Sequence, residues 1–80
     1  MRVRVLISSR PGVLDPEGAA VQQALSELGY GGVGEVRFGK AIWLELEADD
    51  PERARAQARE MCEKLLANPV IETYEIEIED

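Results

Sequence analysis

The chain has no histidine and a single cysteine, Cys62, among its 80 residues. Without histidine, the Ser-His and Cys-His pairs that activate a nucleophile are excluded. A lone cysteine excludes an intrachain disulfide, and no Cys/His cluster has the spacing of zinc ligands. Hydrophobic runs are too short to span a bilayer, and the N-terminal stretch lacks a signal-peptide core. We therefore expect a cytoplasmic protein that holds neither a metal nor a cofactor of its own.

Positive charge is also scarce, since nine Lys and Arg face sixteen Asp and Glu and the net charge is −7. Binding to nucleic acid or to an anionic membrane surface needs clustered basic residues, so neither partner is expected. Aromatic residues make up only 5% of the chain. The strand expected at 2–9 has none and that at 41–48 has only Trp43, which argues against an RNA-recognition domain.

The hydrophobic periodicity predicts one α+β domain over residues 1–80, with the element order β-α-β-β-α-β. We expect strands at 2–9, 33–38, 41–48 and 70–79, and helices at 16–28 and 51–67. A tight hairpin at Gly39-Lys40 would join the second strand to the third. Right-handed crossovers then predict a ferredoxin-like, four-stranded antiparallel sheet of order 4-1-3-2, with both helices on one face.

Each predicted helix begins with an Asp-Pro pair, Asp15-Pro16 and Asp50-Pro51, in which Asp caps the helix and Pro presets the first helical φ. Gly18 is unexpected in a first helical turn, where Ala is better by about 0.5–1 kcal/mol. Either another backbone, a second chain or a ligand approaches it closely, or it merely tolerates a tight entry into the helix.

The sheet face away from the helices is predicted to be open. At one end it carries Leu6, Trp43 and Ile71, which we expect in a self-association surface unless a loop covers them. At the other end Arg2 and Arg4 are expected among glutamates of the neighbouring strands, as a network of ion pairs.

Three candidate chemical groups have simpler structural explanations. Cys62 falls on the apolar face of the second helix and is expected to be a buried structural thiol. Ser8 and Ser9 end the first strand with no evident base beside them. An anion could bind Arg10 in the Ser-Ser-Arg-Pro-Gly segment, but a plain turn is the simpler interpretation.

Three segments closely resemble the PurS family, the small subunit of phosphoribosylformylglycinamidine synthase. They are GVLDPEGAAVQQAL at 12–25, VGEVRFGK at 33–40 and CEKLLANPVIETYEIEI at 62–78. The resemblance implies a non-catalytic subunit of an ATP- and glutamine-dependent C–N ligase of purine biosynthesis. ATP, Mg and glutamine would be used by the other subunits, a large synthetase and a glutaminase. The small subunit would support their assembly and the passage of ammonia between their active sites.

The resemblance also implies a homodimer, and two chains with open faces or edges could complete one another's sheets. The strand at 71–79 is one candidate for the exchanged element. The residues expected to contact the partner subunits are exposed polar residues and one glycine within the matching segments: Asp15, Glu17, Gly18, Gln22, Arg37, Lys40, Lys64 and Asn68. An ACT-like regulatory domain that binds a small ligand at a dimer interface is the alternative, because it fits the length and element order better than other domains of this topology do.

Overall fold

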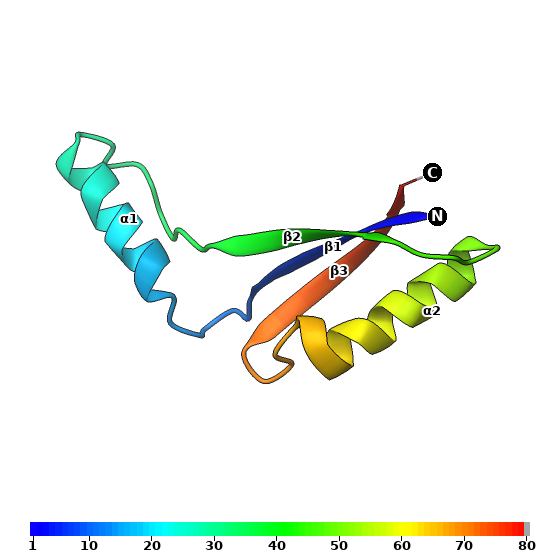
Figure 1. Cartoon of the computed structure of the whole chain (residues 1–80). Helices are drawn as coiled ribbons and strands as arrows, with labels where there is room; N and C mark the ends of the chain where they lie inside the picture. Colours follow the sequence, from blue (N-terminus) through cyan, green and yellow to red (C-terminus); the bar gives the residue numbers. More distant parts are fainter. Residues whose placement is uncertain (80) are drawn as a thin grey trace.

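The chain folds around a three-stranded antiparallel sheet whose central strand comes first in the sequence. The structure is a computed structural model that describes residues 1–79. Strand β1 (Arg2–Ser9) lies between β2 (Gly39–Glu45) and β3 (Glu72–Glu79), so the strand order is β2-β1-β3 (Figure 1). The structure therefore confirms the part 4-1-3 of the expected strand order, in which the first strand lies between the third and the fourth.

Helix α2 (Pro51–Met61) packs against β1 and β3. It begins as the sequence predicts, because Asp50 Oδ1 accepts a hydrogen bond from the backbone N–H of Arg53 at 2.9 Å. Every second residue of β1 faces this helix. The buried core consists of side chains from one face of β1, from one face of α2 and from the segment that follows α2. They are Val3, Val5, Ile7, Ala54, Ala58, Cys62 and Ala67. The alanines let the helix lie close to the sheet, so the core is tight but small.

A π-helical turn, Cys62–Leu66, continues α2, and the N–H of Ala67 closes it by donating to Cys62 O at 3.1 Å. The extent of the predicted helix is therefore right, but the wider turn changes which side chains face the sheet. Cys62 is fully buried, as expected, whereas Leu65 is 83% exposed. Helical periodicity in the sequence predicts Leu65 on the same apolar face as Cys62, and this prediction was wrong because of the wider turn.

The second strand, expected at 33–38, is absent, and so is the hairpin at Gly39-Lys40; these two residues instead begin β2. Gly39 lies opposite Ser8 in the antiparallel ladder, so the chain leaves the sheet after Ser9 and returns to the same place. Residues 10–38, here called the arm, are therefore a long excursion from a pair of neighbouring strands. In the described part of the chain no crossover over the sheet face is made, and no strand pairs with residues 33–38.

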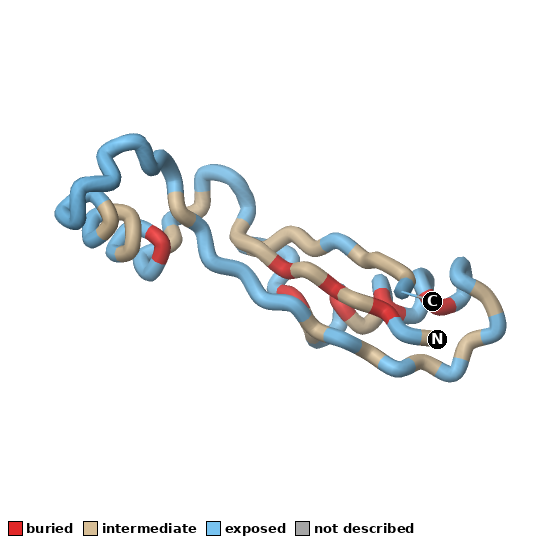
Figure 2. The backbone as a smooth tube through the Cα atoms, turned by 90° about the horizontal axis from the view of Figure 1, so that it is seen from above, coloured by how far each residue is buried: buried red, intermediate tan, exposed pale blue. Residues whose placement is uncertain are grey.

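Helix α1 (Pro16–Glu27) lies in the arm and projects beyond the end of the sheet (Figure 1). Among the helices of residues 1–79 only α2 covers the sheet, so the expectation that both helices lie on one face was wrong. Apart from Gly18 in α1, the buried positions gather in the part of the chain formed by the strands, α2 and the π-helical turn with Ala67 after it, here called the body (Figure 2). The radius of gyration is 16.0 Å, against about 12 Å for a compact chain of this length.

Candidate interaction surfaces

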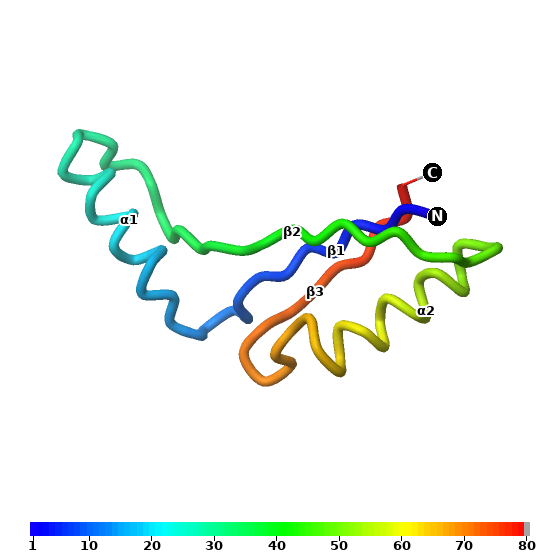
Figure 3. The backbone as a smooth tube through the Cα atoms, in the orientation of Figure 1, coloured from blue at the N-terminus to red at the C-terminus, as the bar shows by residue number. Residues whose placement is uncertain are grey.

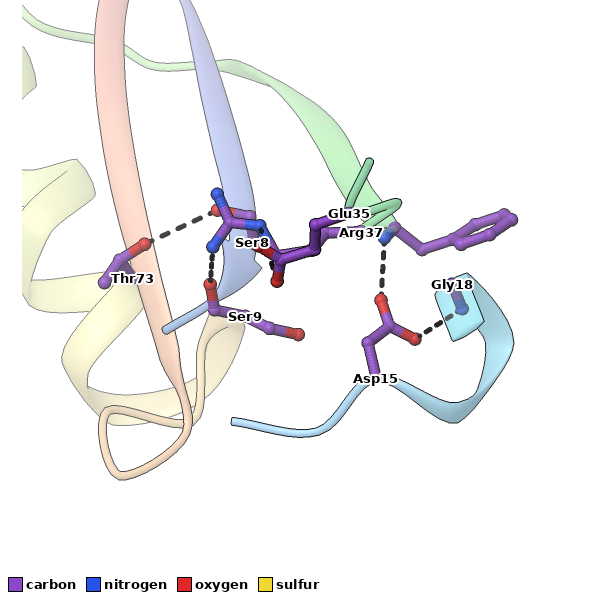
Figure 4. Close-up of polar contacts among 8 residues, drawn as sticks. Ser8, Ser9, Asp15, Gly18, Glu35, Arg37 and Thr73 are labelled. Carbon is purple, nitrogen blue, oxygen red and sulfur yellow. Dashed lines mark hydrogen bonds and ion pairs between the residues drawn. The ribbon is translucent and has the colours of Figure 1, made fainter. Parts of the chain in front are cut away.

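The junction between arm and body is organised by the carboxylate of Asp15 (Figure 4). Its Oδ1 accepts from the backbone N–H of Gly18 at 3.0 Å, which is the helix cap that the sequence predicts. Its Oδ2 accepts from the backbone N–H of Phe38 at 2.7 Å, a contact that the sequence did not indicate. These bonds, that from Gly18 first, favour the ionised carboxylate and lower the pKa of Asp15. One side chain thus holds both ends of the arm together.

Gly18 is buried because another backbone approaches it closely. A Cβ atom at this position would lie 1.9 Å from the carbonyl oxygen of Val36 and 2.8 Å from its carbonyl carbon. Real Cβ contacts are ordinary only beyond 3.4 Å. Of the explanations open from the sequence, close approach of a backbone is therefore the one the structure supports, and that backbone belongs to the same chain.

Arg37 and Lys40, expected to flank a hairpin, instead line one open hollow of about 540 Å³ beside the end of β1. Arg37 Nη1 donates to the carbonyl oxygen of Ser9 at 3.1 Å, and its Nε lies 3.8 Å from Glu35 Oε1. The guanidinium of Arg37 therefore braces the two segments that join arm and body (Figure 4). Lys40 is exposed.

The remaining predicted partner-contact residues do not gather into one surface. Glu17 and Gln22 lie on α1, in the arm. Lys64 lies in the π-helical turn, where its Nζ contacts Glu60 Oε1 at 2.6 Å. Asn68 shapes the following turn, since its Oδ1 accepts from the N–H of Val70 at 3.1 Å. The eight residues therefore occupy the arm, the junction and the end of α2.

The open sheet face carries charged and apolar side chains, but they are less separated than the sequence predicts, because Trp43 lies opposite Arg4 and Glu75 lies opposite Leu6. At the charged end Arg2 Nε lies 3.1 Å from Glu45 Oε1, and Arg4 is paired with Glu77 and, at 3.5 Å, with Glu79. The pairing with Glu77 raises the pKa of the Arg4 guanidinium, which stays charged.

Among the apolar residues of this face, Trp43 is 57% exposed and lies opposite Arg4 in the ladder. The next cross-strand pair on the same face is Leu6 and Ala41. Leu6 and Trp43 are therefore neighbours. Ile71 is 45% exposed and lies before β3, next to Arg10, whose N–H donates to the carbonyl oxygen of Ile71 at 2.9 Å. Ile71 thus lies further along the face than the other two.

Arg10, a weak candidate for anion binding, makes a structural contact. Its Nε and Nη2 donate to the carbonyl oxygen of Pro69 at 3.0 and 2.7 Å, which joins the start of the arm to the turn before β3. The buried Cys62 thiol has a raised pKa, mainly because burial disfavours the thiolate. Within residues 1–79 no three His, Cys, Asp or Glu side chains come together as a metal site, and no helix is long and apolar enough to cross a membrane.

These features define a class: a small α+β subunit with a projecting arm and exposed apolar side chains, suited to contact with other polypeptides. Residues 2–80 match the family described as PurS, Phosphoribosylformylglycinamidine (FGAM) synthase. The chain belongs to the PurS family, whose members are small subunits of phosphoribosylformylglycinamidine synthase, a ligase of purine biosynthesis.

The relatives cover nearly the whole chain. The Synechocystis sp. subunit PurS is 55% identical over 75 residues, which is 94% of this chain and 75% of the relative. The crystal structure of Methanocaldococcus jannaschii PurS has a TM-score of 0.86 at 45% identity, and the match covers 98% of this chain and 94% of that one. A chain in a structure named PurLQS, from Thermotoga maritima, has a TM-score of 0.85 at 37% identity, covering 95% and 93%. The assignment to this family removes the reason for an ACT-like alternative.

Proposed function

We propose that this chain is the assembly subunit of a three-component phosphoribosylformylglycinamidine synthase. It contacts the synthetase and the glutaminase and so supports the transfer of ammonia from one to the other. The observation that carries the proposal is the likeness over 95% of the chain to a subunit found in a structure named PurLQS. The contribution of this chain is contact and placement, while ATP, Mg and glutamine are used by the other subunits.

The arm and its junction support this role. A helix held away from the body by Asp15 and Arg37 presents polar residues where another protein can reach them. Lys40 is exposed beside this junction in a chain of net charge −7. We assign Lys40 and Arg37 to the contact with an acidic surface of a partner subunit, and the surface around Leu6 and Trp43 to association with a second copy.

Reconstitution tests the role directly. The synthetase and glutaminase subunits are mixed with or without this chain, and formation of phosphoribosylformylglycinamidine is measured with glutamine or with ammonium chloride as nitrogen donor. We expect the chain to restore the glutamine-dependent reaction and to change the ammonia-dependent reaction little. Equal glutamine-dependent rates with and without the chain would refute the proposal.

A matched pair of charge reversals tests the junction. Lys40→Glu should weaken the restoration of glutamine-dependent turnover, because it places a negative charge where we assign the contact. Arg53→Glu changes charge by the same amount on the exposed surface of α2 and should leave it unchanged. Equal effects of the two variants would show that only net charge matters.

A further inference from the structure

The outer edge of β3 carries backbone groups that no other strand within residues 1–79 uses. β3 forms one border of the sheet (Figure 3). The backbone N–H of Arg10 donates to the carbonyl oxygen of Ile71 at 2.9 Å, so the odd-numbered residues along β3 face β1. The direction of the backbone groups alternates along an antiparallel strand. The N–H and C=O groups of Tyr74, Ile76 and Ile78 therefore point outward.

A side chain already donates a hydrogen bond to this edge. Arg55 is exposed on α2, and its Nη1 donates to the carbonyl oxygen of Ile76 at 2.9 Å. The guanidinium of Arg55 thus lies where a neighbouring strand would donate a backbone N–H. The outward N–H of Glu72 donates to the carbonyl oxygen of Asn68 at 2.8 Å, within the turn before the strand. The edge open to another strand therefore runs over residues 74–78, here called the β3 edge.

The side chains beside the β3 edge on the open sheet face are acidic. Successive side chains of a strand point to opposite faces, so Glu75, Glu77 and Glu79 share this face. Arg4 pairs with two of them, Glu77 and Glu79. Glu75 is exposed and lies opposite Leu6, and within residues 1–79 no ion pair includes it. The β3 side of this face therefore has an excess of negative charge.

The charges on the open sheet face alternate from strand to strand. Glu45 of β2 lies opposite Arg2 of β1, and Arg2 lies opposite Glu79 of β3. Opposite charges on directly opposed residues stabilise a sheet, whereas like charges destabilise it. A further strand beside β3 would continue this series with Lys or Arg.

The same charges indicate which chain cannot occupy the β3 edge. Two β3 edges paired antiparallel would bring the glutamate row of one copy against the glutamate row of the other. Such like-charge pairing disfavours association of β3 with its own copy, and it is a common protection of strand edges. A basic segment meets no such repulsion, so the row of glutamates selects a chain of the opposite charge.

We propose that the β3 edge binds an extended segment of another protein, with Lys or Arg at every second position. The segment adds an antiparallel strand beside β3, and its backbone N–H replaces the guanidinium of Arg55 at the carbonyl of Ile76. Its basic residues lie opposite Glu75 and Glu77, in non-hydrogen-bonded pairs with Cα atoms about 4.5 Å apart and side chains close together. The intervening side chains lie on the α2 side, beside Ile76. This surface goes beyond the role in the synthase and does not depend on it.

A pair of peptides with one composition tests the pattern. The full chain is titrated at low salt with capped Lys-Val-Lys-Val-Lys or with its isomer Lys-Lys-Lys-Val-Val, and binding is followed by calorimetry. Only the alternating peptide can place all its charges on one face of a strand. We expect it to bind at least about fivefold more tightly than the isomer. Equal affinities would show attraction by net charge alone and would overturn the proposal, as would no binding of the alternating peptide.

Amide hydrogen exchange of the complex tests the added strand. Binding of the alternating peptide should slow exchange of the amides of Tyr74, Ile76 and Ile78, which point outward. The amides of Glu75 and Glu77 face β1 and should change much less. Equal slowing of odd and even positions, or no slowing at either, would contradict a strand added at this edge.

Three variants test the residues that carry the proposal. Glu75→Lys should weaken binding of the alternating peptide by about fivefold or more, because it places a like charge opposite a lysine. Glu27→Lys changes the net charge equally at the end of α1, in the arm, and should alter the affinity by less than about twofold. Arg55→Ala frees the carbonyl of Ile76 and removes a cation, so its affinity should rise. Equal effects of the two lysine variants, or weaker binding by Arg55→Ala, would overturn the proposal.

The reconstitution assay separates this proposal from the synthase role. A chain that binds neither peptide but restores glutamine-dependent turnover refutes the β3 edge as a binding surface and leaves the synthase role intact. A chain that binds the alternating peptide selectively but restores no turnover supports the binding surface and refutes the synthase role.

Discussion

Replacing Gly18 by alanine should destabilise the arm, against the preference of an isolated helix. Alanine favours a helix over glycine by about 0.5–1 kcal/mol. The added Cβ, however, would lie 1.9 Å from the carbonyl oxygen of Val36. Relief of this contact needs a backbone shift of more than 1 Å, which would also pull Phe38 away from Asp15. Overpacking of this kind costs about 1–3 kcal/mol, so we expect a net loss of about 1–2 kcal/mol.

Amide hydrogen exchange measures this loss where it occurs. In Gly18→Ala the amides of α1 and of residues 33–38 should exchange about 5–30 times faster, the factor that one or two kcal/mol implies. Gly31→Ala is a matched control in the same arm, since a Cβ there meets nothing within 4 Å. Slower exchange of α1 in Gly18→Ala than in wild type would show that the contact with Val36 does not explain the glycine.

Three further outcomes follow from the same structure. Because the bonds from Gly18 and Phe38 lower the pKa of Asp15, the contact is present above the ordinary carboxyl pKa of 3.8 and is lost as pH falls through the lowered one. Exchange of α1 should therefore show an acid transition that is absent in Asp15→Asn. Ile7→Val in the 2%-exposed core should cost about 0.5–1.5 kcal/mol, read from the midpoint of urea unfolding. The buried Cys62 thiol, whose pKa is raised by burial, should react with a thiol reagent only as fast as the protein unfolds; a rapid reaction of the native protein would contradict its burial.

The body could be predicted from the sequence because its signals are local. The alternation of Val3, Val5 and Ile7 places one face of β1 in the core, and Asp50-Pro51 marks the start of α2. The register of Arg2 and Arg4 among glutamates follows from antiparallel pairing alone. The π-helical turn at Cys62–Leu66 was missed because a one-residue widening leaves no mark on an apolar pattern.

The junction of arm and body could be predicted only in part. Asp15 and Gly18 stand out in the sequence, one as a cap and the other as an unexpected glycine. Their partners, Phe38 and Val36, lie about twenty residues further along the chain. Every residue except proline has the same backbone N–H and carbonyl groups. The residue type therefore does not indicate which backbone group a residue distant in the sequence will contact.

The two errors in the predicted fold fall on the same stretch of chain, residues 10–38, and they have one physical cause. Residues 33–38 have the pattern of a strand, and α1 has an apolar side, yet within residues 1–79 no strand pairs with the first and the sheet does not cover the second. A hydrophobic pattern indicates which side of a segment is packed against a neighbour. It does not indicate whether that neighbour belongs to the same chain or to another chain. An amphipathic pattern left unsatisfied in one chain therefore marks a surface that is suited to contact with another chain.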